Sequence, residues 1–98
     1  MPQITEDNIR ITEDNIREAL ATDADKAFRM IIDLYGRRLY WHIRRLVITH
    51  DDADDALQNT FLNAWKNIGP FRFDSSLLPW LWTIATNEAL TLIRRRAR

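Results

Sequence analysis

The sequence has 98 residues, of which 46% are apolar and 29% are charged, and its formal net charge is zero. This composition is too apolar for a disordered chain, and the length allows one packed domain. The absence of cysteine excludes disulfides and thiolate metal sites, and no apolar run of eighteen residues or signal peptide occurs, so we expect a soluble, cytoplasmic protein without membrane insertion.

The chain begins with a repeated heptapeptide, since Ile4–Arg10 recurs without change as Ile11–Arg17. Two copies are too few for a repeat fold. The period of seven either continues a helical face or reflects a duplication made when the gene was assembled, and we assign the first copy no function. We therefore expect an N-terminal extension over residues 1–11 and a helical domain over residues 12–98. Thr12 followed by Asn15 indicates a first, short helix from about Thr12 to Ala21.

A long second helix is predicted from about Asp25 to Ile48, after a break at Thr22–Asp25. Apolar residues at helical spacing form one broad side: Phe28, Ile31, Ile32, Tyr35, Leu39, Ile43 and Leu46. A narrower second stripe holds Met30, Leu34, Trp41 and Ile48. Two apolar stripes indicate neighbours on two sides, as for the central helix of a bundle.

A third helix is expected from about Asp52 to Asn67, ended by Gly69-Pro70. Its buried side would hold Ala53, Ala56, Leu57, Phe61, Ala64 and Ile68. Its opposite side carries Asp55, Gln58, Asn59 and Leu62, whose spacing places them on one continuous ridge. We call these four residues the α-helical ridge. Such a ridge is either a docking surface for a partner helix or ordinary solvated surface.

The last helix is expected from about Leu77 to Arg96, after a loop over Phe71–Ser76 that ends in a capping serine. Pro79 falls in the first turn, where its missing N–H costs little. Leu77, Leu81, Ile84, Ala85 and Leu92 form the expected inner stripe, and Thr83, Thr86, Asn87, Leu90 and Arg94 face elsewhere. With two Gly and three Pro in the whole chain, the prediction is an all-α bundle of three main helices plus a short N-terminal one.

Aromatic and basic residues gather in the last third of the chain. Phe71, Phe73, Trp80 and Trp82 are interleaved with Arg72 and followed by Arg94, Arg95 and Arg96. Rings that stack on unpaired bases and arginines that hold phosphates are typical of single-strand binding. We expect Trp80 to belong to the core and Phe73 to be exposed.

Charge is sorted into blocks along the chain. Residues 1–25 carry −5, residues 26–50 carry +5, residues 51–74 carry −3 and residues 75–98 carry +3. This pattern suits two partners of opposite character, although solvated helix faces could produce it as well.

Catalysis finds no support in the sequence. His42 and His50 have no metal-binding spacing around them, and no glycine-rich phosphate loop or calcium loop occurs. We therefore expect no enzyme, no metal and no cofactor.

Three segments, in this order and spacing, resemble region two of bacterial sigma factors of the extracytoplasmic-function group: Asp52–Trp65, Phe71–Ser76 and Trp80–Asn87, followed by the arginine cluster. The resemblance covers about residues 26–98. It implies that Asp55, Gln58 and Asn59 dock on the clamp helices of the largest subunit of core RNA polymerase.

The same resemblance implies roles in binding single-stranded promoter DNA. Phe71, Arg72, Phe73, Asp74, Ser75 and Ser76, together with Asn87, would form a pocket for a base flipped out of the minus-ten element, with Thr83 on the same outward side. Arg94, Arg95 and Arg96 would lie along phosphates. An anti-sigma factor is a further candidate partner.

The chain departs from the family pattern at four positions. The family usually has an acid at Asn59, a glycine at Phe73, a threonine at Pro79 and an apolar residue at Glu88. Glu88 falls on the expected inner stripe and would need a polar partner there. Family members also continue into a second helical domain that reads the minus-thirty-five element, so we expect an isolated domain that finds promoters poorly alone.

Two other functions fit the residues. A duplex-DNA regulator would need a compact helix-turn-helix, against which the aromatic-rich loop argues. A protein-only helical adaptor would leave the terminal arginines without a role.

Overall fold

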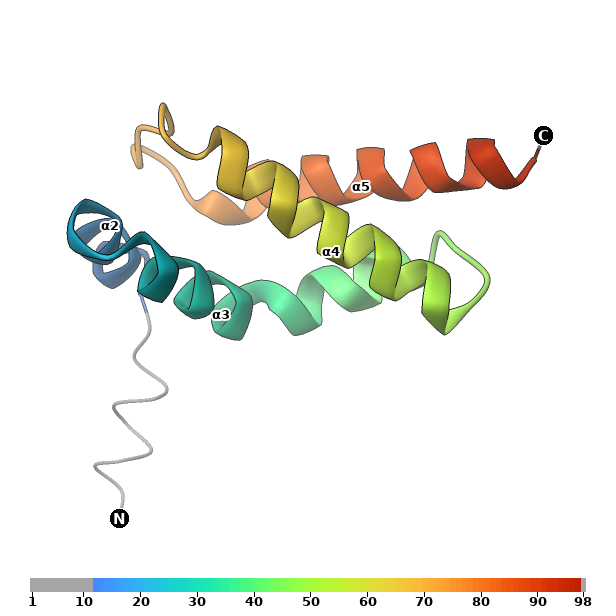
Figure 1. Cartoon of the computed structure of the whole chain (residues 1–98), viewed down its shortest axis with the longest axis horizontal. Coiled ribbons are helices and arrows are strands. Elements are labelled where there is room, and N and C mark those ends of the chain that lie inside the picture. Colours follow the sequence, from blue (N-terminus) through green and yellow to red (C-terminus); the bar gives the residue numbers. More distant parts are fainter. Residues whose placement is uncertain (1–11, 98) are drawn as a thin grey trace, which may run out of the picture.

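The computed structural model describes residues 12–97, which form four α-helices and no strand. Helices α3 (Ala24–Arg44), α4 (His50–Asn67) and α5 (Leu77–Arg96) run along the long axis of the molecule, and the short α2 (Glu13–Thr22) lies across the beginning of α3 (Figure 1). The predicted all-α bundle is therefore confirmed. The first heptapeptide copy and the rest of residues 1–11 lie outside the described residues, as does Arg98.

Each helix begins at a side chain that caps its free N–H groups. Thr12 and Asn15 form a reciprocal capping box at α2, as their spacing predicted, and the Thr12 hydroxyl accepts from the Asn15 N–H at 3.2 Å. Asp23 caps α3, Thr49 caps α4 and Ser76 caps α5. Local hydrogen bonds of this kind are worth about 1 kcal/mol each and fix where a helix can start.

The C-terminal end of α3 differs from its prediction, because the helix stops at Arg44 rather than continuing to Ile48. Val47, Ile48 and Thr49 are β-branched, which disfavours helix, and Thr49 is extended so that it can cap α4. The Arg44 guanidinium closes the turn by donating to the Val47 carbonyl at 3.1 Å. Helix α4 consequently begins at His50, two residues before the predicted start.

This early end changes which apolar residues of α3 are buried. Val47 is buried, whereas Leu46 and Ile48, predicted inside, are exposed, Ile48 by 85%. Trp41, on the predicted second stripe, is also exposed. The second stripe is therefore only partly buried, since Met30 and Leu34 pack against the core while Trp41 and Ile48 do not.

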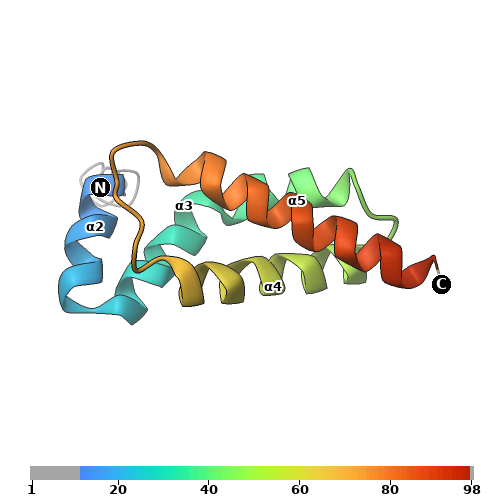
Figure 2. The ribbon, with the colours of Figure 1, turned by 90° about the horizontal axis from the view of Figure 1, so that it is seen from above.

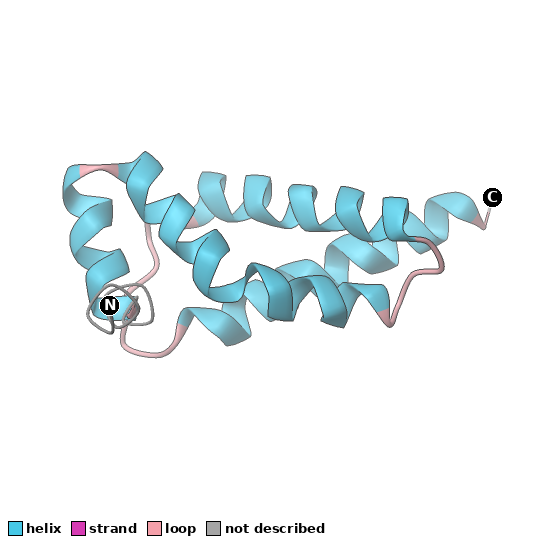
Figure 3. Ribbon diagram, turned by 90° about the horizontal axis from the view of Figure 1, so that it is seen from below, coloured by secondary structure: helices cyan, strands magenta, loops and turns pink. Residues whose placement is uncertain are grey.

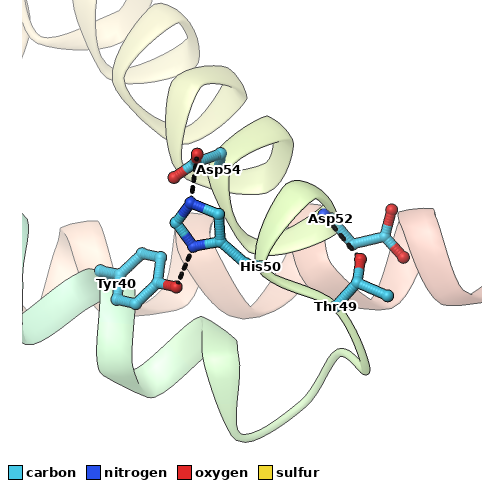
Figure 4. A network of polar contacts seen from close by, with 5 residues as sticks. All are labelled: Tyr40, Thr49, His50, Asp52 and Asp54. Carbon is cyan, nitrogen blue, oxygen red and sulfur yellow. Dashed lines mark hydrogen bonds and ion pairs between the residues drawn. The ribbon is translucent and has the colours of Figure 1, made fainter.

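A polar contact pins the junction between α3 and α4 (Figure 4). The Tyr40 hydroxyl and His50 Nδ1 lie 2.6 Å apart, and His50 Nε2 lies 3.1 Å from an Asp54 carboxylate oxygen. A neutral imidazole satisfies both partners, since Nδ1 accepts from the hydroxyl and Nε2–H donates to the carboxylate. His50 therefore has a structural role.

The core lies where α3 meets α2, α4 and α5. Its large fully buried side chains are Ile16, Ile31, Leu39, Ile43, Leu77 and Leu81. Burying each of them fully contributes about 1.5–3 kcal/mol. Figures 2 and 3 show the structure turned by 90° from Figure 1, and α3, α4 and α5 again lie alongside one another.

Small residues occupy many of the buried positions of α4 and α5, two helices that pack against each other. The buried positions of α4 include Ala53, Ala56, Thr60 and Ala64, and those of α5 include Ala85 and Ala89. Thr60, which the sequence did not single out, is fully buried and satisfies its hydroxyl by donating to the Ala56 carbonyl at 2.7 Å. We call these six residues the small-residue seam.

No helix within residues 12–97 combines the length and the apolar character that crossing a membrane requires.

Candidate docking and nucleic-acid interfaces

The α-helical ridge lies on the outer surface of α4. Asp55, Gln58, Asn59 and Leu62 are all exposed, and Leu62 presents 59% of its surface to solvent. The predicted shared face is therefore confirmed, although exposure alone does not assign it a partner.

An apolar groove runs along one side of the ridge, between α3 and α4. Phe28, Ile32, Gln58, Phe61, Leu62 and Trp65 line it. The rings of Phe28 and Trp65 meet edge to face with centroids 4.8 Å apart, which holds Trp65 half-exposed beside Leu62. A partner that reaches the ridge would meet apolar surface next to polar groups, as in many protein interfaces.

A polar groove runs along the other side of the ridge, between α4 and α5. Asn59, Leu62, Asn63, Lys66, Asn67, Glu88 and Arg95 line it. Glu88 is half-buried and its carboxylate accepts a hydrogen bond from the Asn63 side chain at 3.4 Å. The carboxylate thus has the polar partner that its position on α5 requires.

The aromatic residues of the Phe71–Ser76 loop pack on one another. The ring of Phe71 meets that of Phe73 edge to face with centroids 4.9 Å apart, and its centroid lies 5.3 Å from that of Trp80. All three side chains are half-buried. The expectation that Trp80 belongs to the core is confirmed, and the expectation that Phe73 is exposed was wrong. Arg72, Asp74, Ser75 and Ser76 are exposed.

Phe73 has a left-handed backbone, with φ at 59°, and no other non-glycine residue among those described has a positive φ. This conformation suits glycine, which is the residue that the family pattern usually has here. The ring packing of Phe73 offsets part of the backbone cost.

Glu13 of α2 occupies the beginning of α5. Its carboxylate accepts from the Leu77 N–H at 2.7 and 2.9 Å and from the Ser76 hydroxyl at 3.0 Å, and it is also hydrogen-bonded to the Tyr35 hydroxyl. The Leu78 N–H donates to Ser76. The Leu77 and Leu78 N–H groups at the start of α5 are thus already paired within the protein. Burial raises the pKa of Tyr35, and its bond to Glu13 raises it further.

Thr83, Asn87 and Arg94 are exposed and continue one outward side of α5. Asn87 stands eleven residues after Ser76, which is about 16 Å along a helix axis. The structure therefore brings Thr83 and Asn87 together but separates Asn87 from the loop by more than the width of one base.

The terminal arginines point in different directions. Arg96 forms an ion pair with Asp52, whose side chain is largely buried, and Arg95 lines the polar groove beside α4. Arg94 alone continues the outward side that carries Asn87. The three residues therefore do not form one phosphate-binding row.

A basic surface on α3, not assigned from the sequence, borders this side of α5. Arg38 lines a shallow groove with Leu78, Pro79, Trp82 and Thr83. His42 stacks on Trp82, with ring centroids 3.8 Å apart, and its Nε2 is 2.7 Å from the Thr86 hydroxyl. The spacing of Arg38, His42 and Arg45 was the available signal, since it places them on one helical face.

The surroundings of His42 favour its neutral form. Its partial burial lowers its pKa below the ordinary value of 6.5, and the positive charge of Arg45 lowers it further. A neutral imidazole at this position orients Trp82, which stays 37% exposed next to Thr83.

Among residues 12–97, no three His, Asp or Glu side chains gather where they could hold a metal ion.

Comparison with known proteins identifies relatives over most of the chain. Residues 31–98 match the family model described as Sigma-70 region 2. The RNA polymerase sigma factor NccH of Alcaligenes xylosoxydans xylosoxydans is 33% identical over 90 residues, covering 88% of this chain and 48% of the relative.

Two further relatives carry extracytoplasmic-function sigma factor names. Sigma factor SigM of Mycobacterium tuberculosis is 38% identical over 69 residues, 70% of this chain and 35% of the relative. Sigma factor SigW of Bacillus subtilis is 32% identical over 81 residues, 83% of this chain and 43% of the relative. The chain thus spans less than half the length of each of these three.

Proposed function

The chain belongs to the sigma-70 region 2 family, in the extracytoplasmic-function group that residues 26–98 resemble, and from this membership we propose that it docks on core RNA polymerase and binds the melted non-template strand of the minus-ten element. It acts in transcription initiation by binding, without catalysis or a cofactor, in the cytoplasm where polymerase works. The family match over α3, α4 and α5 carries the proposal.

The α-helical ridge is the proposed polymerase contact. Its four side chains are free of the core, and the apolar groove beside it adds Ile32 and Trp65 as exposed contact area. Asp55 is the acidic residue that remains there, since Asn59 stands where the family usually has an acid. We therefore propose a contact with the clamp helices that depends on Asp55 and Gln58.

The border between α3 and α5 is the proposed strand contact. In a three-helix arrangement the α3–α5 groove lies away from α4, so a strand there leaves the ridge free. Trp82 offers an exposed ring for stacking, which is worth about 1–3 kcal/mol per base, and Arg38 and Arg94 offer charges for phosphates.

We propose that the domain contacts bases at two separate positions of the strand. The loop from Phe71 to Ser76 takes one flipped base, and Asn87 with Thr83 contacts another, because about 16 Å of helix separates them. Unstacking a base costs a few kcal/mol, which the ring and amide contacts offset.

The test of the function is a two-step measurement with the full chain. The chain should retain core polymerase in a pull-down, and the complex should then crosslink to a melted minus-ten strand but not to the same sequence as duplex. Preference for duplex would favour a major-groove regulator, and loss of all DNA contact in the complex would favour a protein-only adaptor.

The ridge assignment has its own variant. Asp55→Ala with Gln58→Ala should weaken binding to core polymerase at least tenfold, about the loss expected for charged and polar contacts at an interface. Helicity and melting temperature should stay within 2–3 °C of wild type, because both side chains are exposed. Asp33→Ala, which removes one exposed acid from α3, is the matched control. Unchanged affinity in the double variant would refute the assignment.

A further inference from the structure

Glu13 joins three elements that are distant in the sequence. It belongs to α2, it is hydrogen-bonded to Tyr35 of α3, and it accepts hydrogen bonds from Ser76 and Leu77 at the junction of the loop and α5. Sixty-three and sixty-four residues separate it from these last two partners. Figure 2 shows the loop before α5 passing beside α2.

The position of this carboxylate matters for the chemistry of the loop. The N-terminus of a helix attracts anions through its free N–H groups and its dipole. Glu13 already fills this position at α5, so a DNA phosphate would meet a carboxylate there. Recognition at the loop is left to the side chains of Phe71–Ser76.

The contact also restrains the backbone of the loop. Ser76 and Leu77 end a segment that begins at Gly69 and contains a left-handed residue at Phe73. With its far end fixed by the hydrogen bonds that Ser76 and Leu77 donate to Glu13, the loop keeps one arrangement before a base arrives. Preorganisation of this kind raises discrimination between ligands, because a loose loop adapts to the wrong one.

We infer that Glu13 is a positioning residue for base recognition, which fixes the Phe71–Ser76 loop through the beginning of α5 and keeps phosphates away from that helix terminus. The inference rests on the proposed function, because it assumes that the loop reads a base of the melted strand. Nothing in it requires Glu13 to touch DNA.

Glu13→Gln in the full chain, bound to core polymerase, is the test. The probes are melted minus-ten strands varied base by base, and the measurement is the ratio of affinities between the best and the worst base at each position. Because neutral hydrogen bonds replace charge-assisted ones, discrimination at the loop-read position should fall about three- to tenfold. Discrimination at the position read by Asn87 should stay unchanged.

The control is Asp14→Asn, which removes the same charge from the next residue of the same helical turn. Asp14 is exposed, so its variant should keep wild-type discrimination at every position. Amide exchange gives a second readout, since the Leu77 N–H should exchange about tenfold faster in Glu13→Gln than in Asp14→Asn.

Several outcomes decide between the two proposals. If wild type shows no base preference, the proposed function fails. If wild type has a preference that Glu13→Gln keeps, or that Asp14→Asn loses equally, the role of Glu13 is overturned while the function stands. If Glu13→Gln does not fold, Tyr35→Phe replaces it, because this change keeps the buried ring and removes only the hydroxyl that orients Glu13. The same selective loss is expected, about two- to threefold, and its absence overturns the role.

Discussion

The left-handed backbone of Phe73 predicts an unusual order of stability between two variants, Phe73→Gly and Phe73→Ala. At most positions alanine stabilises a protein relative to glycine, by about 0.4–1 kcal/mol, because it restricts the unfolded chain. At φ 59° a residue with a Cβ is strained, so this order should be reversed.

The magnitude follows from two opposing terms. The left-handed conformation costs alanine about 1–2 kcal/mol and glycine almost nothing. Subtracting the chain-entropy advantage of alanine leaves Phe73→Gly more stable by about 0.5–1 kcal/mol. Both variants lose the edge-to-face contact with Phe71, so this loss cancels in the comparison.

Thermal and urea unfolding followed by circular dichroism measure this difference. For a domain of this size, 1 kcal/mol shifts the melting temperature by about 4–8 °C. Arg72→Gly and Arg72→Ala form the matched pair, since Arg72 is exposed and has an ordinary negative φ, and there alanine should be the more stable. Finding Phe73→Ala as stable as Phe73→Gly would show that the strain argument is wrong.

Two further predictions concern α5 and its neighbour on α3. Asn87→Ala should reduce base preference at one minus-ten position by about 1–3 kcal/mol without affecting polymerase retention, measured with strands varied base by base; an unchanged profile would mean that Asn87 is only a surface residue. The folded-state pKa of His42 is depressed, so its contribution to stability is present above pH 6.5 and is lost as the pH falls through the lower folded value. Between pH 7 and pH 5.5 the melting temperature of wild type should fall further than that of His42→Gln; equal losses would contradict the assignment.

The starts of α2 and α5 could be predicted from the sequence because capping is local. Thr12 with Asn15, and Ser76 before Leu77, sit within three residues of the N–H groups that they satisfy. The end of α3 was not predicted, because no Gly or Pro marks it and the apolar period continues through Ile48. The helix ends because Val47, Ile48 and Thr49 are β-branched and because Thr49 must be extended to cap α4.

The candidate site was predictable only where one helix carries it. The exposure of the α-helical ridge follows from spacing on α4. The role of Glu13 does not, because Asp14 beside it has the same chemistry and only the placement of α2 against α5 tells them apart. Arg38 and Arg45 were missed for a similar reason, since their nearness to α5 depends on how α3 is rotated in the bundle.

The small-residue seam limits how far α4 and α5 can move relative to each other. Alanine has no side-chain torsion to adjust, and the Thr60 hydroxyl is held by the Ala56 carbonyl, so these buried positions cannot repack by side-chain motion if α4 and α5 shift. Ala56 and Ala85 are fully buried, so a larger side chain at either position would have to displace its neighbours. A partner that binds the outer face of α4 therefore also fixes the position of Thr83 and Asn87 on α5. The small-residue seam therefore keeps a constant distance between the α-helical ridge on α4 and the side of α5 that carries Thr83 and Asn87.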